Sequence, residues 1–290
     1  MKYPFQDFKA DFPNDDACLD RILALRYGER PVCPSCGKSS KLHRVAGRRA
    51  YACQHCGHHV YPCVGTPFEK SSTPLTLWFH AMYLMTSTRN GVAAKELERQ
   101  LGVTYKTAWR MGHELRKLMA DGFSKATPPT PLSGHVEVDE TYVGGVAKGK
   151  RGRGAKHKTI VVGIVERGGN VRTKIVKDVK RDTLVKVVTN NVEPGTIVST
   201  DELLSYRTLP VHGYKHGTVR HSSWQWVNDI HHTNSIEGFW SILKRGIRST
   251  HVHVSRKYLQ NYANEFAFRY NNRKAGGDMF NVMLAKTSGK

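Results

Sequence analysis

Residues 134–145 read GHVEVDETYVGG, and this stretch decides the fold. Within it, apolar Val136 and Val138 alternate with acidic Glu137 and Asp139. A period of two is typical of a half-buried β-strand, because successive side chains of a strand point to opposite faces of the sheet. The stretch therefore predicts a strand with Asp139 on its polar face.

Further β-rich runs and helical patterns follow this strand towards the C-terminus. The expected strands cover residues 158–166, 171–179 and 195–200. The expected helices cover residues 181–192, 234–247 and 256–273. Strands that are interleaved with helices favour an α/β fold built in layers.

Three acidic residues occur in contexts that suit a metal site. Asp139 lies in the first strand, Asp201 ends the run GTIVSTD, and Glu237 lies in the helical stretch NSIEGFWSILKRGI. Lys244 is two turns further along the same helix face. Carboxylates that converge can hold two hard cations, Mg²⁺ or Mn²⁺, which activate water and stabilise the leaving oxygen of a phosphodiester. The alternative is three unrelated surface carboxylates, and we favour the metal site.

The composition indicates a polyanionic partner. Among 290 residues, 45 Lys and Arg outnumber 24 Asp and Glu, which gives a formal net charge of +21. Nucleic acid is the first candidate, because each neutralised phosphate releases counterions. A membrane surface is the alternative, but the sequence holds no apolar stretch of roughly eighteen residues or more. Residues 1–16 also lack the apolar core of a signal peptide, so we expect a cytoplasmic, nucleoid-associated protein.

Two C-x-x-C pairs give a strong local signal. They are Cys33 with Cys36 and Cys53 with Cys56, and a glycine follows each pair. Each pair lets two thiolates reach one ion from a tight turn, and two pairs complete a tetrahedral Zn²⁺ site. The alternative is two unrelated pairs of reduced cysteines. We expect a structural zinc ribbon that folds on its metal.

A helix-turn-helix is expected over residues 91–109, GVAAKELERQLGVTYKTAW. The first helix would end at Gly102, and Thr104 would cap a second helix that carries Lys106 and Arg110. Basic side chains on a second helix of this kind can reach bases and phosphates in a major groove. The alternative is an ordinary helical hairpin.

A basic loop, KGKRGRGAKHK, covers residues 148–158. Such a loop could follow a phosphate backbone, and the alternative is a solvated hairpin loop. We expect its Lys and Arg side chains to line one connected surface with the second helix of the helix-turn-helix and with the basic end of the helix that carries Glu237, including Lys244, and we expect this surface to run to the three acids. The candidate DNA contacts in the basic loop and in the helix that carries Glu237 are Lys148, Lys150, Arg151, Arg153, Lys156, Arg245 and Arg248.

Composition shifts divide the chain into five parts. The Pro-, Ser- and Thr-rich stretch SKATPPTPLSG is the clearest boundary. The expected parts are an N-terminal helical segment (1–30), the zinc ribbon (31–70), the helix-turn-helix domain (71–123), a linker (124–134) and the domain of the three acids (135–290).

The order of these motifs resembles that of the DDE transposases of bacterial insertion sequences, in the ISXO-type group with an N-terminal zinc ribbon. The resemblance rests on the paired cysteines, the helix-turn-helix, and the segments GTPFE (65–69), PLTLW (74–78), DETYVGG (139–145), Thr200–Asp201 and HTNSIEGFWSILKR (232–245). It implies an RNase H-like mixed sheet with flanking helices as catalytic core, and a divalent metal. It also implies a homo-oligomer, a dimer or larger, on double-stranded DNA.

Carried over residue by residue, the resemblance implies a triad of Asp139, Asp201 and Glu237. Lys244 matches the basic residue seven positions after the third acid. Asn234, one helical turn before Glu237, is the alternate third ligand, since some related transposases carry Asn there. Glu140 and Glu202, next to the two aspartates, are expected to point elsewhere.

The expected activity is cleavage at the terminal inverted repeats of a transposon and strand transfer into target DNA. One alternative is a zinc-ribbon and helix-turn-helix regulator with an inactive catalytic remnant. A nearer alternative is a metal-dependent DNA nuclease that does not join strands.

Overall fold

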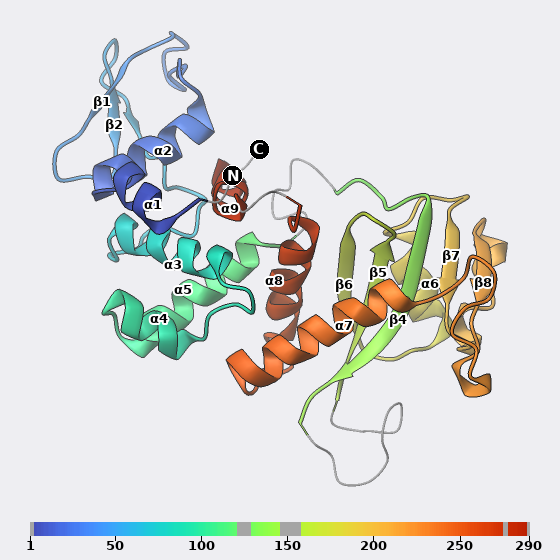
Figure 1. Ribbon diagram of the computed structural model, residues 1–290. Helices are drawn as coiled ribbons and strands as arrows, with labels where there is room; N and C mark the ends of the chain where they lie inside the picture. Colours follow the sequence, from blue (N-terminus) through green and yellow to red (C-terminus); the bar gives the residue numbers. More distant parts are fainter. Residues whose placement is uncertain (1–2, 121–128, 146–157, 275–277, 289–290) are drawn as a thin grey trace. The chain divides into compact units, whose positions relative to one another are not determined.

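The computed structural model describes residues 3–120, 129–145, 158–274 and 278–288. The chain forms two compact units (Figure 1). The first comprises residues 1–128 together with 274–290, and the second comprises residues 129–273. In the part of the chain that is described, no helix is both long and apolar enough to cross a bilayer.

The first unit begins with two helices and a small ribbon. Helix α1 (Phe5–Asp11) and α2 (Asp15–Tyr27) precede the antiparallel strands β1 (Leu42–Arg44), β2 (Tyr51–Cys53) and β3 (His59–Val60). Helix α3 (Leu75–Ser87) follows the ribbon. Both oxygens of Asp15 accept 2.9 Å hydrogen bonds from the first backbone N–H groups of α3, which ties α2 to that helix.

The two helices expected for the helix-turn-helix form in the predicted places. They are α4 (Ala94–Leu101) and α5 (Tyr105–Leu118). Gly102 ends α4 with φ of +63°, a left-handed conformation that glycine adopts without strain. The hydroxyl of Thr104 accepts from the backbone N–H of Thr107 and caps α5.

The C-terminal segment belongs to the first unit. Helix α9 (Met279–Ala285) and the short helix η6 (Lys286–Ser288) follow residue 278. The ring of Phe280 packs 5.5–5.7 Å from the rings of Tyr3, Phe8 and Phe12. The chain therefore divides differently from the expected domain 135–290, because α9 and η6 belong to the N-terminal unit.

The second unit is built on a five-stranded mixed sheet with the order β6-β5-β4-β7-β8. Strands β4 and β5 are antiparallel, as are β5 and β6, whereas β4, β7 and β8 run parallel. This order confirms the expected RNase H-like mixed sheet. The strands are β4 (His135–Val143), β5 (Thr159–Glu166), β6 (Val171–Val176), β7 (Ile197–Thr200) and β8 (Lys215–Thr218).

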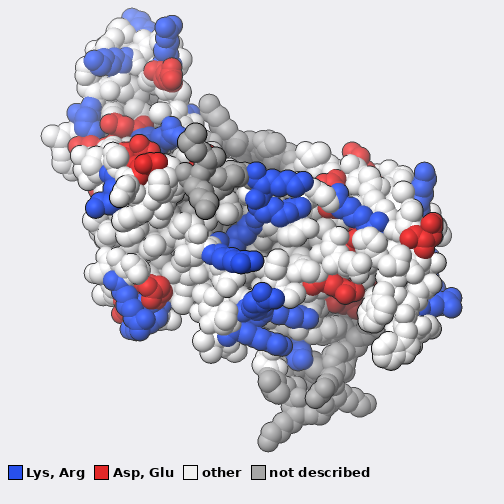
Figure 2. All heavy atoms as spheres, viewed as in Figure 1, with Lys and Arg blue, Asp and Glu red and all other residues white. Residues whose placement is uncertain are grey.

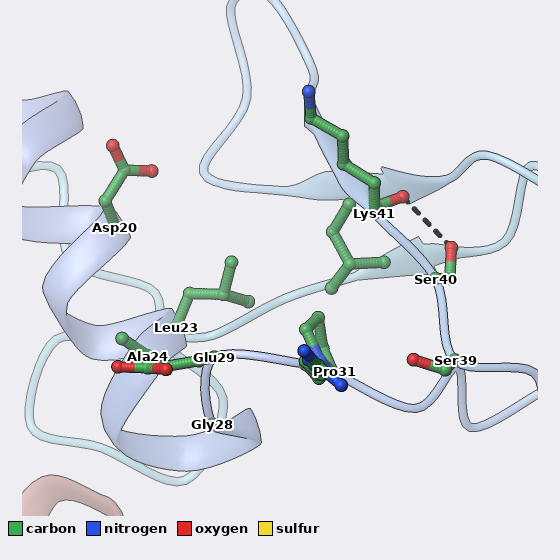
Figure 3. Close-up of a pocket in the computed structure, with 11 residues that line it drawn as sticks. Asp20, Leu23, Ala24, Gly28, Glu29, Pro31, Ser39, Ser40 and Lys41 are labelled. Carbon is green, nitrogen blue, oxygen red and sulfur yellow. Dashed lines mark hydrogen bonds between the residues drawn. The ribbon is translucent and has the colours of Figure 1, made fainter.

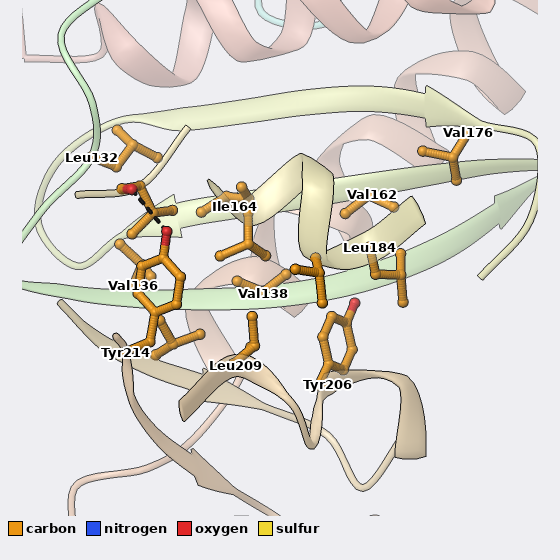
Figure 4. Packing of buried hydrophobic residues seen from close by; sticks show 14 residues of the cluster. Leu132, Val136, Val138, Val162, Ile164, Val176, Leu184, Tyr206, Leu209 and Tyr214 are labelled. Carbon is orange, nitrogen blue, oxygen red and sulfur yellow. Dashed lines mark hydrogen bonds between the residues drawn. The ribbon is translucent and has the colours of Figure 1, made fainter. Parts of the chain in front are cut away.

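Helices cover both faces of this sheet (Figure 1). Helix α6 (Arg181–Thr189) packs on one face, over the cluster of Val136, Val138, Ile164 and Leu184 shown in Figure 4. Helices α7 (Asn234–Gly246) and α8 (Leu259–Asn271) pack on the other face. Short helical turns link these elements at Leu204–Tyr206, Leu209–His212, His221–Ser223 and Ile247–His251.

Candidate active site

An acidic group forms where β4 and β7 run side by side. The register pairs Glu137 with Ser199, so Asp139 follows two residues later on β4, and Asp201 follows two residues later, directly after the end of the parallel strand β7. Ligand oxygens of Asp139, Asp201 and Glu140 all lie within 4.8 Å of one another. The structure therefore brings together two of the three acids singled out in the sequence.

The expectation that Glu140 points elsewhere is wrong. The hydroxyl of Tyr206 donates to Oε2 of Glu140 at 3.2 Å, and this buried contact holds the carboxylate at the acidic group. Tyr206 lies in the turn that directly follows Asp201, so the same loop positions both acids. Glu202 does turn away, because its oxygens accept from the backbone N–H groups of His221 and Ser222.

The electrostatics of the group suit a cation. Burial, together with the neighbouring carboxylates of Glu140 and Asp201, raises the pKa of Asp139 to about 7. A bound divalent cation would relieve this repulsion, and carboxylate oxygens are the ligands that Mg²⁺ and Mn²⁺ prefer. The residues present therefore fit a divalent metal site.

Helix α7 approaches the sheet directly over Asp139. Gly163 on β5 pairs with Asp139 across the sheet. A Cβ at Gly163 would lie 2.6 Å from the Trp240 ring, so glycine leaves the space that this ring fills. The indole Nε1 of Trp240 donates to Oδ2 of Asp139 at 2.9 Å. Glu237 and Lys244, three residues before and four after Trp240, lie on the same helix face.

Glu237 is outside the acidic group. Its Oε1 accepts from the Thr233 hydroxyl at 2.8 Å and lies 3.4 Å from Nε2 of His221. The side chain is 45% exposed. Asn234, the alternate third ligand, is also exposed at the start of α7. The third position of the triad therefore remains a prediction.

Glu137 is a positioning residue that sequence reasoning missed. Its side chain is fully buried, and its Oε2 accepts from the backbone N–H groups of Ser235 and Ile236 at 2.8 and 3.0 Å. Its Oε1 accepts from Nε of Arg167 at 2.9 Å. A carboxylate at a helix N-terminus is favoured by the helix dipole, so Glu137 anchors α7 to the sheet. The available signal was its place two residues before Asp139 on the same strand face.

Basic side chains extend from the acidic group along α7. Figure 2 shows Lys and Arg gathered over the C-terminal half of that helix, next to a patch of acidic side chains. Lys244 is partly buried, and burial lowers the pKa of its ammonium group while nearby Asp139 opposes that shift. Arg245 and Arg248 are exposed.

The other candidate DNA contacts divide into two sets. In the first unit, Lys106 is exposed on α5. Arg110 donates to the Ser71 hydroxyl at 3.3 Å and lies over the Trp78 ring at 5.3 Å. The remaining candidates lie outside the described residues: Lys148, Lys150, Arg151, Arg153 and Lys156.

The four paired cysteines form a second group of metal-binding side chains. Sγ of Cys33 lies 3.7 Å from that of Cys56, and Sγ of Cys36 lies 3.9 Å from that of Cys53. Four sulfurs about 2.3 Å from one Zn²⁺ are about 3.8 Å apart, so the spacing fits zinc. The glycine after each pair has φ of +70°, as the tight turns require.

Ser40 supports one of these thiols. Its Oγ lies 3.1 Å from Sγ of Cys53, and this hydrogen bond is the main reason that the pKa of Cys53 falls to about 5. The same Oγ lies 3.0 Å from the carbonyl oxygen of Lys41, beside a pocket of about 420 Å³ between α2 and the ribbon (Figure 3). A lowered pKa favours the thiolate, which is the form that binds zinc.

Comparisons with known proteins agree with this arrangement. An ISXO2-like transposase domain is matched over residues 131–271, and a transposase zinc-ribbon domain over residues 13–59. An uncharacterized protein in transposable element ISH50 of Halobacterium salinarum is 28% identical over 94% of this chain and 97% of its own. An uncharacterized transposase-like protein of Haemophilus influenzae is 29% identical over 35% of this chain and 81% of its own.

Solved structures give a more distant likeness. The Mos1 transposase paired-end complex with left transposon end aligns over 72% of this chain and 78% of its own, with 12% identity and a TM-score of 0.28. The Mos1 strand transfer complex aligns over 73% and 78%, with 12% identity and a TM-score of 0.30. Because these scores are low, the fold assignment rests on the strand order of the sheet.

Proposed function

Since the chain belongs to the family of transposases that carry a zinc ribbon and an ISXO2-like transposase domain, we propose that it cuts and joins DNA. The reaction is metal-dependent phosphoryl transfer, with cleavage at transposon ends followed by strand transfer into target DNA. One observation carries the proposal: Asp139, Glu140 and Asp201 bring ligand oxygens within 4.8 Å of one another on a sheet of RNase H-like order.

Asp139 and Asp201 are the proposed ligands of two divalent ions, Mg²⁺ or Mn²⁺. When bound, such ions activate a water or a 3′-hydroxyl and stabilise the leaving oxygen. The chain itself supplies position: β4 and β7 fix the two carboxylates, and Trp240 holds one oxygen of Asp139. Positioning and charge stabilisation carry most of phosphoryl transfer, so no separate nucleophilic side chain is required.

Glu237 is the proposed third carboxylate, and Lys244 is proposed to hold a phosphate near the cut. Both share the helix face of Trp240, whose ring contacts Asp139. Glu237 would have to release its contacts to Thr233 and His221 to reach a metal.

Glu140 and Asn234 compete with Glu237 for the third position. A titration of the protein with Mn²⁺ separates them. We expect Glu237→Gln to weaken Mn²⁺ binding about tenfold or more, while Glu140→Gln and Asn234→Ala have smaller effects. A larger loss in Glu140→Gln would transfer the role to that residue, which already lies in the acidic group.

Double-stranded DNA is the proposed partner, as terminal inverted repeats and as target. The net charge of +21 and the basic side chains along α7 support this assignment. We propose contacts from Lys106 and Arg110 as well, with the ribbon held by structural zinc. A homo-oligomer, a dimer or larger, would bring two ends to one target, at the nucleoid in the cytoplasm.

The test is incubation of purified protein with Mg²⁺ and duplexes that carry the inverted repeats of its source element. Strand-transfer products are expected from the wild type and should be lost in Asp201→Asn. Cleavage without joining would instead identify a nuclease. A protein that binds intact ends without cutting them, and binds ends with a free 3′-hydroxyl without joining them, would be a DNA-binding regulator.

A further inference from the structure

A pocket of about 580 Å³ opens beside the basic end of α7, within the second unit. Its walls are the end of β4 with the two glycines that follow it, Lys158 before β5, and the segment Ile247–Val254. Val143 lines it and lies four residues after Asp139 on the same strand face, which is about 13 Å along the strand. The pocket is therefore adjacent to the acidic group but separate from it.

The lining combines cationic and apolar groups. Lys158, Lys244, Arg248 and His253 supply the polar part, while none of the described residues that line the pocket is acidic. Val143, Ile247 and Val254 supply apolar surface, and Tyr142 adds an aromatic ring. This combination suits a ligand with one anionic end and one flat, apolar end, and the volume lies in the roughly 300–1,000 Å³ range of small-molecule sites.

The backbone beside the pocket is unusual. Helix α7 passes into a π-helical turn at Ile247–His251, a feature that is frequent at functional sites. Val252 follows with φ of +60°, although a β-branched residue strongly disfavours the left-handed region. The residue is 80% exposed and lines the pocket. Backbone strain of this kind is found preferentially at active sites and ligand clamps.

Lys244 and Arg248 connect the pocket to the basic side chains along α7. Both also line a second hollow on α7, together with Ser241, Arg245 and Ser249. Lys244 is close enough to Asp139 for the carboxylate to influence the pKa of its ammonium group. A DNA strand that passes the acidic group would therefore meet these two cations and then the pocket.

We propose that this pocket holds one nucleotide of the bound DNA strand, turned out of the base stack close to the phosphodiester that is cut. Its base lies against Tyr142 and the valines, and its phosphate lies on Lys244 and Arg248. Turning a base out of a duplex breaks its stacking and pairing, and a fitted pocket offsets that cost. The site rests on the proposed function for its substrate, but it concerns DNA binding and needs no catalysis.

The experiment uses the full-length protein and an end duplex with 2-aminopurine at successive positions near the cut. The buffer contains Ca²⁺ in place of Mg²⁺, so that binding is followed without cleavage. Because 2-aminopurine fluoresces when it leaves the base stack, wild-type protein should raise the fluorescence several-fold at one position. An absence of any rise at every position would overturn the proposal, whatever the protein does with Mg²⁺.

Two variants assign the signal to this pocket. Val254→Trp fills it, and His253→Glu places a negative charge in its exposed wall without touching the core. Both should abolish the fluorescence rise. The matched controls Val211→Trp and His212→Glu, at exposed positions elsewhere in the same unit, should retain it. A rise that survives in a folded His253→Glu protein would place the flipped base elsewhere.

A competition experiment distinguishes a site for a nucleotide within the DNA strand from a site for a free nucleotide. Deoxyadenosine monophosphate or inorganic phosphate is added to the complex in a titration from micromolar to millimolar concentration. Retention of the fluorescence rise supports a site for a nucleotide within the strand. Loss of the rise at micromolar mononucleotide would contradict it and indicate a site for free nucleotides. Absence of cleavage in Mg²⁺ beside an intact rise would refute the proposed function alone.

Discussion

The zinc ribbon and the acidic group are both sites of converging metal ligands, but they are assembled in opposite ways. The ribbon takes its four sulfurs from two tight turns within residues 33–56. The acidic group takes its carboxylates from β4 and from the loop after β7, and the proposed third ligand from α7, far apart in the sequence. The spacing of the cysteines along the sequence is therefore enough to define the first site, whereas the second site depends on the register of the sheet and on where α7 packs.

The largest expected effect concerns the ribbon, because structural zinc in small domains contributes roughly 10–16 kcal/mol to folding. Cys33→Ser should lose the zinc and unfold the ribbon, while the melting transition of the second unit stays unchanged. Zinc analysis and proteolysis of the ribbon check this. The control variant Cys63→Ala removes a buried thiol outside the group of four cysteines and should keep its zinc. Stoichiometric zinc in Cys33→Ser would contradict the local assembly of this site.

The next largest effect concerns the acidic group. Asp201→Asn removes one of the charges proposed to hold metal, so cleavage should fall by about 10³ or more, which is about 4 kcal/mol. DNA affinity should stay equal or rise, because one repulsion with the phosphates disappears. Single-turnover cleavage and salt-dependent binding measure the two effects. Glu202→Gln is the matched control, since that neighbouring acid turns away from the group.

The contrast between the sites also explains how much the sequence could predict. The cysteine ligands and the glycines after them could be identified because their geometry is local. The principal strands and helices of the second unit lie where hydrophobic periodicity predicted them. Strand β8, KHGT, was missed because it is short and carries no apolar alternation. Helix α9 was predicted neither as a helix nor as part of the first unit, since only tertiary packing of Phe280 reveals its partner.

The acidic group was only partly predictable for the same reason. Asp139 and Asp201 could be paired, since both lie at or beside strands that were expected to share one sheet. Glu140 could not be placed, because its position depends on the hydroxyl of Tyr206 from a later loop. The role of Glu137 depends on where α7 begins relative to β4, which no periodicity encodes.

A medium effect is expected where α7 is anchored. Glu137→Gln keeps the size of the side chain but removes the charge that faces Arg167 and the first turn of α7. Hydrogen bonds to charged groups contribute about 1.5–3 kcal/mol, so the Tm of the second unit should fall by roughly 3–12 °C. Calorimetry checks this, with exposed Glu193→Gln as control. An unchanged Tm would mean that α7 is held by its apolar face alone.

The smallest expected effect is a pH dependence of the stability of the second unit, which should be independent of the release of zinc from the ribbon by acid. Burial, with help from Arg167 and His231, lowers the pKa of His135 to about 4. Nδ1 of His135 accepts from Arg167, and its Nε2 lies 2.8 Å from the Ser199 hydroxyl, so the fold requires the neutral ring. The unfolded chain takes up a proton below about pH 6.5.

The stability that this ring contributes is therefore complete above pH 6.5 and is lost as the pH falls towards 4. The contribution of His135 to the Tm of the second unit should therefore decline by a few degrees over this window, whereas Asp139, whose pKa is raised to about 7, contributes in the opposite direction in both wild type and variant. In His135→Gln the decline should be shallower, whereas exposed His212→Gln should match the wild type. Acid also protonates the ribbon thiolates, so release of zinc is followed separately with a chromogenic chelator. His135→Gln should leave the pH at which zinc is released unchanged. If it altered zinc release and left the pH dependence of Tm as in the wild type, the ribbon and the second unit would not respond to acid independently, contrary to this prediction.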